Sequence, residues 1–193
     1  MGSAKERAEA MNVMLELSPR TFWWRTLVVH VCTYALVGLL AMLVLDYPRL
    51  YAETTLQLLM RPTTSAWVAA GPALQLIRGS LYAGVLWPLR GQLLTGEFRV
   101  LYGLLVGLAI LGPAGPAPGS LEGLYFTRLS PSLHLIGLPE VLLQTAAFTF
   151  LLRRWCARPR RWMNVAGGVG LALVLLFSVL GVLDALLPGG LGR

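Results

Sequence analysis

Residues 27–45 read LVVHVCTYALVGLLAMLVL, a run of 19 residues without a charged side chain. As an α-helix this run would rise about 28 Å, which nearly matches the ~30 Å hydrocarbon core of a bilayer. Residues 163–183, MNVAGGVGLALVLLFSVLGVL, form a second uncharged run of similar length. These two stretches predict an all-α integral membrane protein.

The composition of the whole chain supports the same class. Of its 193 residues, 56% are hydrophobic and 13% are charged, whereas a soluble domain carries about 25% charged residues. The net charge of +7 comes from side chains that cluster between apolar runs instead of forming the patch or stripe of a nucleic-acid-binding protein. We therefore expect membrane lipid as a partner and no nucleic acid.

Three further apolar runs are predicted spans, at residues 66–89, 100–111 and 134–152. The run at 100–111 would rise only about 18 Å as a helix. The Gly/Pro-rich segment Gly112–Pro131 follows it and breaks any helix. We therefore predict one domain over residues 1–193 with about five transmembrane helices. The third helix is broken, and an outer loop re-enters or caps the bundle. Residues 1–22 are predicted to form a cytoplasmic or interfacial helix.

Lys and Arg residues are unevenly distributed between the two sets of connections. One set, together with the N-terminal segment, holds Lys5, Arg7, Arg20, Arg25, Arg90, Arg99, Arg153, Arg154, Arg158, Arg160 and Arg161. The other set holds Arg49, Arg61, Arg128 and Arg193. Because cytoplasmic loops are enriched in Lys and Arg, we expect a multi-pass protein of the plasma (inner) membrane, with a cytoplasmic N-terminus and an external C-terminus.

Two charges lie inside apolar runs. Arg78 is about 18 Å from Arg90 along a helix, and Glu140 is about 20 Å from Arg153. Both depths are counted from the same face, and the broken end of the third span falls at a similar depth. Since an unpaired ion in hydrocarbon costs at least ~2.5–3.5 kcal/mol, the counts predict a buried Arg78–Glu140 pair. The alternative is a pair that only fixes helix register.

Other polar side chains are expected to accompany this pair. Gln75 and Tyr82 share a helical face with Arg78, and Gln144 shares one with Glu140. The predicted pocket also takes in the outer loop and its end, with Glu122, Tyr125, Arg128 and His134. For Glu122 and Arg128 the alternative is a surface loop pair. For His134, a capping role is commoner than catalysis, and His30 is expected to contact a neighbouring helix.

Some classes of site are not expected. Without a cluster of His, Cys and carboxylate side chains at ligand spacing, we predict no metal. No cofactor-binding motif occurs, so we predict no cofactor, and Cys32 and Cys156 are expected to be unpaired. Glycines at 103, 107, 167, 168 and 170 could allow close helix approach within one chain or between chains.

Three functions remain open. In the first, the pocket binds or passes a small polar or anionic solute or a lipid headgroup, with Arg78 contacting the anion. In the second, the chain is a non-catalytic subunit or assembly factor of a larger membrane complex, or a homo-oligomer. In the third, it is an intramembrane enzyme acting on lipid or peptide, with Glu122, His134 or Glu140 as acid or base. The absence of a nucleophile motif favours a protein without enzymatic activity.

Overall fold

The computed structural model describes residues 12, 16–52, 54–91, 97–111 and 118–187. Within these ranges the chain forms helices and no strands. Most of the predicted N-terminal helix at 1–22 and the first part of the predicted outer loop, residues 112–117, lie outside the described residues. The first long helix, α2, begins at Pro19.

Five helices coincide with the five predicted runs. They are α2 (Pro19–Val44), α5 (Ala66–Leu86), α7 (Phe98–Leu111), α10 (Leu138–Ala157) and α11 (Arg161–Leu186). Three helical segments are long and apolar enough to cross a membrane: α2, Pro131–Ala157 and α11. Helix α5 has 21 residues but contains Pro72, Gln75 and Arg78, and α7 has 14 residues, or about 21 Å.

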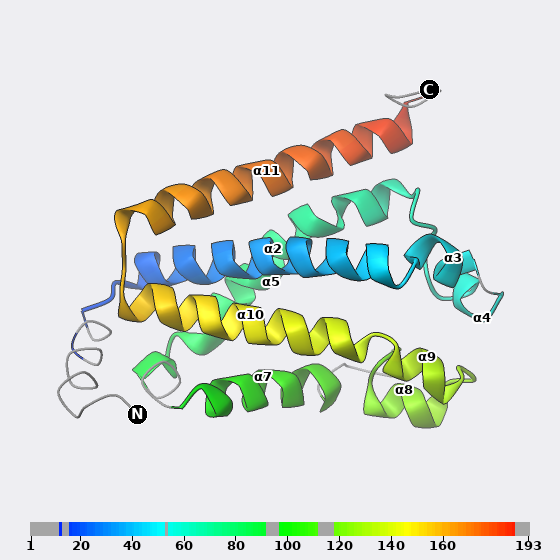
Figure 1. Ribbon diagram of the computed structural model, residues 1–193, viewed down its shortest axis with the longest axis horizontal. Coiled ribbons are helices and arrows are strands. Elements are labelled where there is room, and N and C mark those ends of the chain that lie inside the picture. The colour runs from blue at the N-terminus through cyan, green and yellow to red at the C-terminus, as the bar shows by residue number, and fades with distance from the viewer. Residues whose placement is uncertain (1–11, 13–15, 53, 92–96, 112–117, 188–193) are drawn as a thin grey trace.

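The long helices form a bundle in which α2 is central (Figure 1). Helix α2 packs against α5, α10 and α11, and α7 packs on α10. Helix α5 crosses behind α2 obliquely, so that it starts beside α11 and passes across α2 (Figure 1). This oblique course determines which residues of α5 lie close to α2.

The two ends of the bundle differ in composition. At one end α2, α7 and α11 begin and α10 ends (Figure 1), and we name it the basic end. It includes Arg20, Arg25, Arg99, Arg154, Arg158 and Arg161. At the opposite end lie four short helices, α3 (Tyr47–Ala52), α4 (Thr54–Gln57), α8 (Leu121–Phe126) and α9 (Pro131–Leu135). We name it the capped end.

Several serines begin the helices. Ser18 precedes Pro19, and its side chain accepts a hydrogen bond from the amide of Thr21. Ser65 begins α5 and Ser120 begins α8 in the same way. These side chains satisfy amides that have no partner within the first turn of a helix.

The buried core lies toward the basic end. Phe22, Val28, Val31, Leu152 and Cys156 are each at most 1% exposed. Many leucines and valines on the outer faces of the helices are exposed, as expected where lipid replaces water as the solvent.

Glycines allow α11 to approach its neighbours closely. A Cβ atom on Gly167 would lie 2.6 Å from Cη2 of Trp155 and 2.9 Å from Cγ1 of Val28. One on Gly170 would lie 3.1 Å from Sγ of Cys32. These two glycines therefore serve packing within the chain. A Cβ atom would meet nothing within 4 Å at Gly103, Gly107 and Gly168.

Candidate functional site

Glu140 lies in the first turn of α10, at the capped end of the bundle, and is half-buried. Its Oε2 atom accepts a hydrogen bond from the hydroxyl of Tyr47 in α3. Its Oε1 atom faces α2, where a Cβ atom on Gly38 would lie 3.7 Å away. A carboxylate at this position interacts favourably with the positive end of the helix dipole.

A cavity of about 240 Å³ lies beside Glu140. Residues from α3, α4, α7, α9 and α10 line it, together with the segment that precedes α8. Its polar lining consists of Tyr47, Tyr51, Ser120, His134 and Glu140. Among the residues that the structure describes, Glu140 is the only charged side chain in this lining. The cavity therefore has an acidic, hydrogen-bonding side.

Two tyrosines of α3 shape this side of the cavity. Their rings stack with centroids 5.1 Å apart and an angle of 16° between the planes. Burial raises the pKa of Tyr47 above the ordinary value, and the hydrogen bond to Glu140 raises it further. Burial and the charge of Glu140 also raise the pKa of Tyr51. Both hydroxyls therefore keep their protons at neutral pH and can donate hydrogen bonds.

His134 uses both of its ring nitrogens to hold the loop that closes the cavity. The amide of Gly119 donates to Nδ1 at 3.2 Å, and Nε2 lies 3.1 Å from Oγ1 of Thr127. Because an amide can only donate, Nδ1 is the acceptor and Nε2 carries the proton. The hydroxyl of Thr127 in turn donates to the carbonyl of Gly123. His134 is 4% exposed, so its geometry indicates a structural role.

Arg78 lies in a different part of the bundle. It is exposed on α5, and its guanidinium lies 5.7 Å from the ring centroid of Tyr82. Gln75, one turn away, lies with Oε1 3.1 Å from Nε2 of His30. The His30 ring also contacts the rings of Tyr82 and Phe148. The prediction that His30 is a helix-contact residue is thereby confirmed.

The structure does not pair Arg78 with Glu140. Within the described ranges the one ion pair joins Arg99 to Glu97 at 2.7 Å, and both side chains are exposed. The prediction that Arg78 and Glu140 lie at the same depth was wrong, because each depth was counted from an arginine and not from the end of the helix. Arg78 is eight residues from the end of α5 at Leu86, or about 12 Å. Glu140 is 17 residues from the end of α10 at Ala157, or about 26 Å.

Contacts with α2 show the same separation. Gly79, next to Arg78, packs against Leu27 and His30, whereas Glu140 faces Gly38. Positions 30 and 38 of α2 are separated by about 12 Å along the helix axis. The two predicted halves of the site therefore lie at different levels of the bundle.

The remaining predicted residues are placed around the capped end. Gln144 is half-buried one turn after Glu140, and Glu122, Tyr125 and Arg128 are exposed on and after α8. None of these four lines the cavity. The structure adds Tyr47 and Tyr51, whose only sequence signal is their i, i+4 spacing directly after the first apolar run.

Comparisons of the chain with protein-family models, curated proteins and solved structures gave no match.

Proposed function

We propose that the protein is a small multi-pass membrane protein whose capped-end cavity binds a small polar solute or a lipid headgroup. One observation carries the proposal: a half-buried carboxylate, that of Glu140, is the single charged group among the described residues lining a 240 Å³ cavity. Pockets with a few convergent polar groups are the usual binding sites of proteins.

The charge of the lining selects the chemical class of the ligand. Arg78, the residue expected to contact an anion, does not line the cavity. The carboxylate of Glu140 attracts a cation and repels an anion. Tyrosine rings bind organic cations through their π faces, and Tyr47 and Tyr51 lie beside Glu140. We therefore propose a ligand that carries an ammonium group in preference to a phosphate or carboxylate.

We further propose five membrane crossings, with α5 and α7 completing the bundle. Residues 118–131 then cap the cavity from outside. The arginines at the basic end support a cytoplasmic location of that end in a plasma (inner) membrane. The ring of Tyr82 beside Arg78 partly offsets the cost of a guanidinium at membrane depth.

The proposal is tested by ligand-induced thermal stabilisation of the purified protein in detergent. The ligands are ethanolamine, inorganic phosphate and glycerol, and the variants are Glu140→Gln, Tyr47→Phe and a control, Glu97→Gln. We expect ethanolamine alone to raise the Tm of the wild type and of Glu97→Gln, and to lose this effect in Glu140→Gln. Tyr47→Phe should weaken the response. Stabilisation by phosphate alone, or an unchanged response in Glu140→Gln, would contradict the proposal.

A second candidate function is that of a subunit of a larger membrane complex or of a homo-oligomer. The supporting observation is α7, which packs on α10 while a Cβ atom on Gly103 or Gly107 would meet nothing within 4 Å. Glycines spaced in this way allow two helices to approach closely. If this function holds, the protein expressed alone should be unstable or associate, and Gly103→Leu should change its partners. The enzyme hypothesis gains no support from His134, because both of its nitrogens are engaged.

A further inference from the structure

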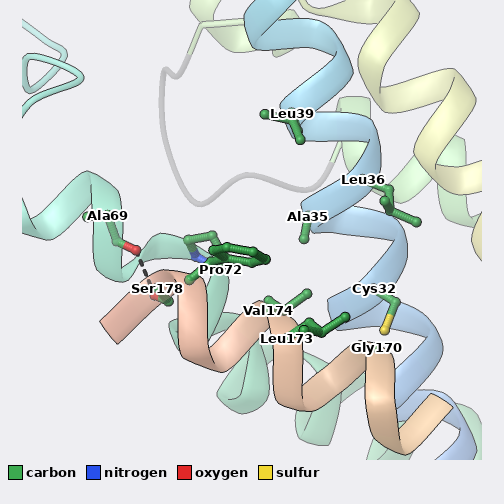
Figure 2. A pocket seen from close by; sticks show the side chains of 11 residues that line it. Cys32, Ala35, Leu36, Leu39, Ala69, Pro72, Gly170, Leu173, Val174 and Ser178 are labelled. Atoms are coloured by element: carbon green, nitrogen blue, oxygen red, sulfur yellow. Dashed lines mark hydrogen bonds between the residues drawn. The ribbon is translucent and has the colours of Figure 1, made fainter. Parts of the chain in front are cut away.

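A second cavity, of about 570 Å³, lies between α2, α5 and α11 (Figure 2). Figure 2 shows α2 on one side, and α5 and α11 on the other, joined by a hydrogen bond between Ser178 and Ala69. Small residues line its interior, including Ala35, Ala69 and Gly170. Large exposed side chains line its rim: Leu36, Leu39, Leu173 and Phe177. We name this cavity the apolar groove.

The groove exists because the three helices approach one another at different levels. Helices α2 and α5 approach closely at Gly79, where a Cβ atom would lie 3.1 Å from Cδ1 of Leu27. Helices α5 and α11 approach closely at Gly181, where a Cβ atom would lie 3.1 Å from Cβ of Ala69. Between these points α5 leaves α2 for α11, so a wedge opens beside α2 in the capped half of the bundle.

Pro72 and Ser178 fix the wall of the groove. Pro72 has no amide proton, so the carbonyl of Val68, four residues earlier, receives no helical hydrogen bond from it. Ser178 of α11 donates to the next carbonyl, that of Ala69, at 2.6 Å. Hydroxyls from neighbouring helices commonly bond to backbone carbonyls near helix-breaking residues in membranes. The hydroxyl of Ser178 in the wall is therefore already paired.

The groove has the length and the chemistry of an acyl-chain site. Its lining runs from Cys32 to Leu39 on α2 and from Gly170 to Ser178 on α11, which is about 11 to 12 Å along each helix. This covers most of the ~15 Å of hydrocarbon in one leaflet. Among the described residues its lining holds no charged side chain, and an apolar cavity does not hold ordered water.

We propose that the apolar groove binds one acyl chain of a membrane lipid in the leaflet on the capped side. The exposed Leu36 and Phe177 at the rim would hold a helix of ~10 Å diameter away from the small residues inside. A single methylene chain is narrow enough to reach them. This binding site is separate from the cavity at Glu140, and neither proposal depends on the other.

The test uses a phosphatidylcholine with a photoactivatable group in its acyl chain, incorporated with the full-length protein into vesicles. We expect cross-links concentrated on the groove segments of α2 and α11, well above those at Val85, which is exposed on α5 outside the groove. The variant Ala35→Trp should lose the groove cross-links because the indole fills the interior. The matched control Leu43→Trp, at an exposed position of α2 outside the groove, should keep them.

Two further measurements distinguish loss of lipid binding from misfolding of a variant and from occupation of the groove by a second copy of the chain. If Ala35→Trp lowers the Tm, the variant Leu39→Trp is used in its place. Its indole blocks the rim of the groove and should likewise abolish the groove cross-links. Cross-links spread evenly over all exposed apolar positions, or equal labelling in wild type and both groove variants, would overturn the proposal. So would efficient joining of two chains through Cys32 by a bifunctional maleimide, because that would place a second copy at the groove. Cys156 is 0% exposed and does not interfere.

Discussion

The two halves of α2 have different environments. From Arg25 to Val31 every residue is buried, including the polar side chains of Arg25, Thr26 and His30. From Leu36 to Val44 the buried residues are Val37 and Ala41. Both cavities border the capped half of the bundle. The comparison indicates that dense packing at the basic end defines the fold, while looser packing at the capped end leaves the two cavities.

The packed half can be disrupted at a single glycine. Gly167→Ala should lower the free energy of unfolding by about 3 kcal/mol, because overpacked cores lose this much and the new methyl would meet the rings and side chains of Trp155 and Val28. The adjacent Gly168→Ala has open space and should leave stability unchanged or raise it by about 0.5 kcal/mol through helix propensity. Equal losses in both variants, measured by unfolding in detergent, would contradict the contrast between the two positions.

Arg25 provides the second test of the packed half. It is 6% exposed, and its guanidinium donates to the carbonyl of Trp155 in the last turns of α10 at 3.2 Å. Cations at a helix C-terminus contribute up to about 2 kcal/mol in partly buried sites. We expect Arg25→Leu to lower stability by about this amount and Arg20→Leu, at an exposed position of the first turn of α2, to have little effect. A smaller loss in Arg25→Leu than in Arg20→Leu would contradict this role.

A smaller effect is expected where α5 and α11 meet. Ser178→Ala removes the hydrogen bond to the carbonyl of Ala69, and interhelical hydrogen bonds in membranes contribute about 0.6 kcal/mol on average. Ser80→Ala is the matched control, because its hydroxyl bonds the carbonyl of Leu76 within its own helix. Thermal unfolding of both variants should show the larger shift for Ser178→Ala; the reverse order would show that this contact does not join the helices.

The last effect is absent at neutral pH and appears only at alkaline pH, in the capped half. The pKa of Tyr47 is raised in the folded protein, so the folded state holds its proton more tightly than the unfolded state does. The resulting stabilisation is complete below pH ~10 and is lost as pH rises through the higher folded value. Tyrosinate absorbance should show a late-titrating group that Tyr47→Phe removes. A late-titrating group that persists in that variant would show that the group is not Tyr47.

The positions of the five long helices could be predicted because each coincides with an apolar run that carries at most one charged side chain. The levels of Arg78 and Glu140 could not be predicted, because the depth of each was counted from an arginine. Arg90 lies beyond the end of α5, whereas Arg153 lies inside α10. The oblique course of α5 also leaves no pattern in the sequence. Glu140 stands out in the sequence as a charge inside an apolar run, whereas Tyr47, which donates a hydrogen bond to it, follows the first apolar run without such a signal.

The close approaches of α11 bear on the order in which the bundle can assemble during synthesis. Helix α11 meets α2 near its start, at Gly167 and Gly170, and meets α5 near its end, at Gly181. It follows both helices in the chain, so its docking surface is complete only after they are in place. Until α11 docks, the small residues of the apolar groove face the bilayer without a third wall. The groove is therefore a late product of biogenesis, and the proposed acyl-chain site would gain its third wall only once the last of these helices has inserted.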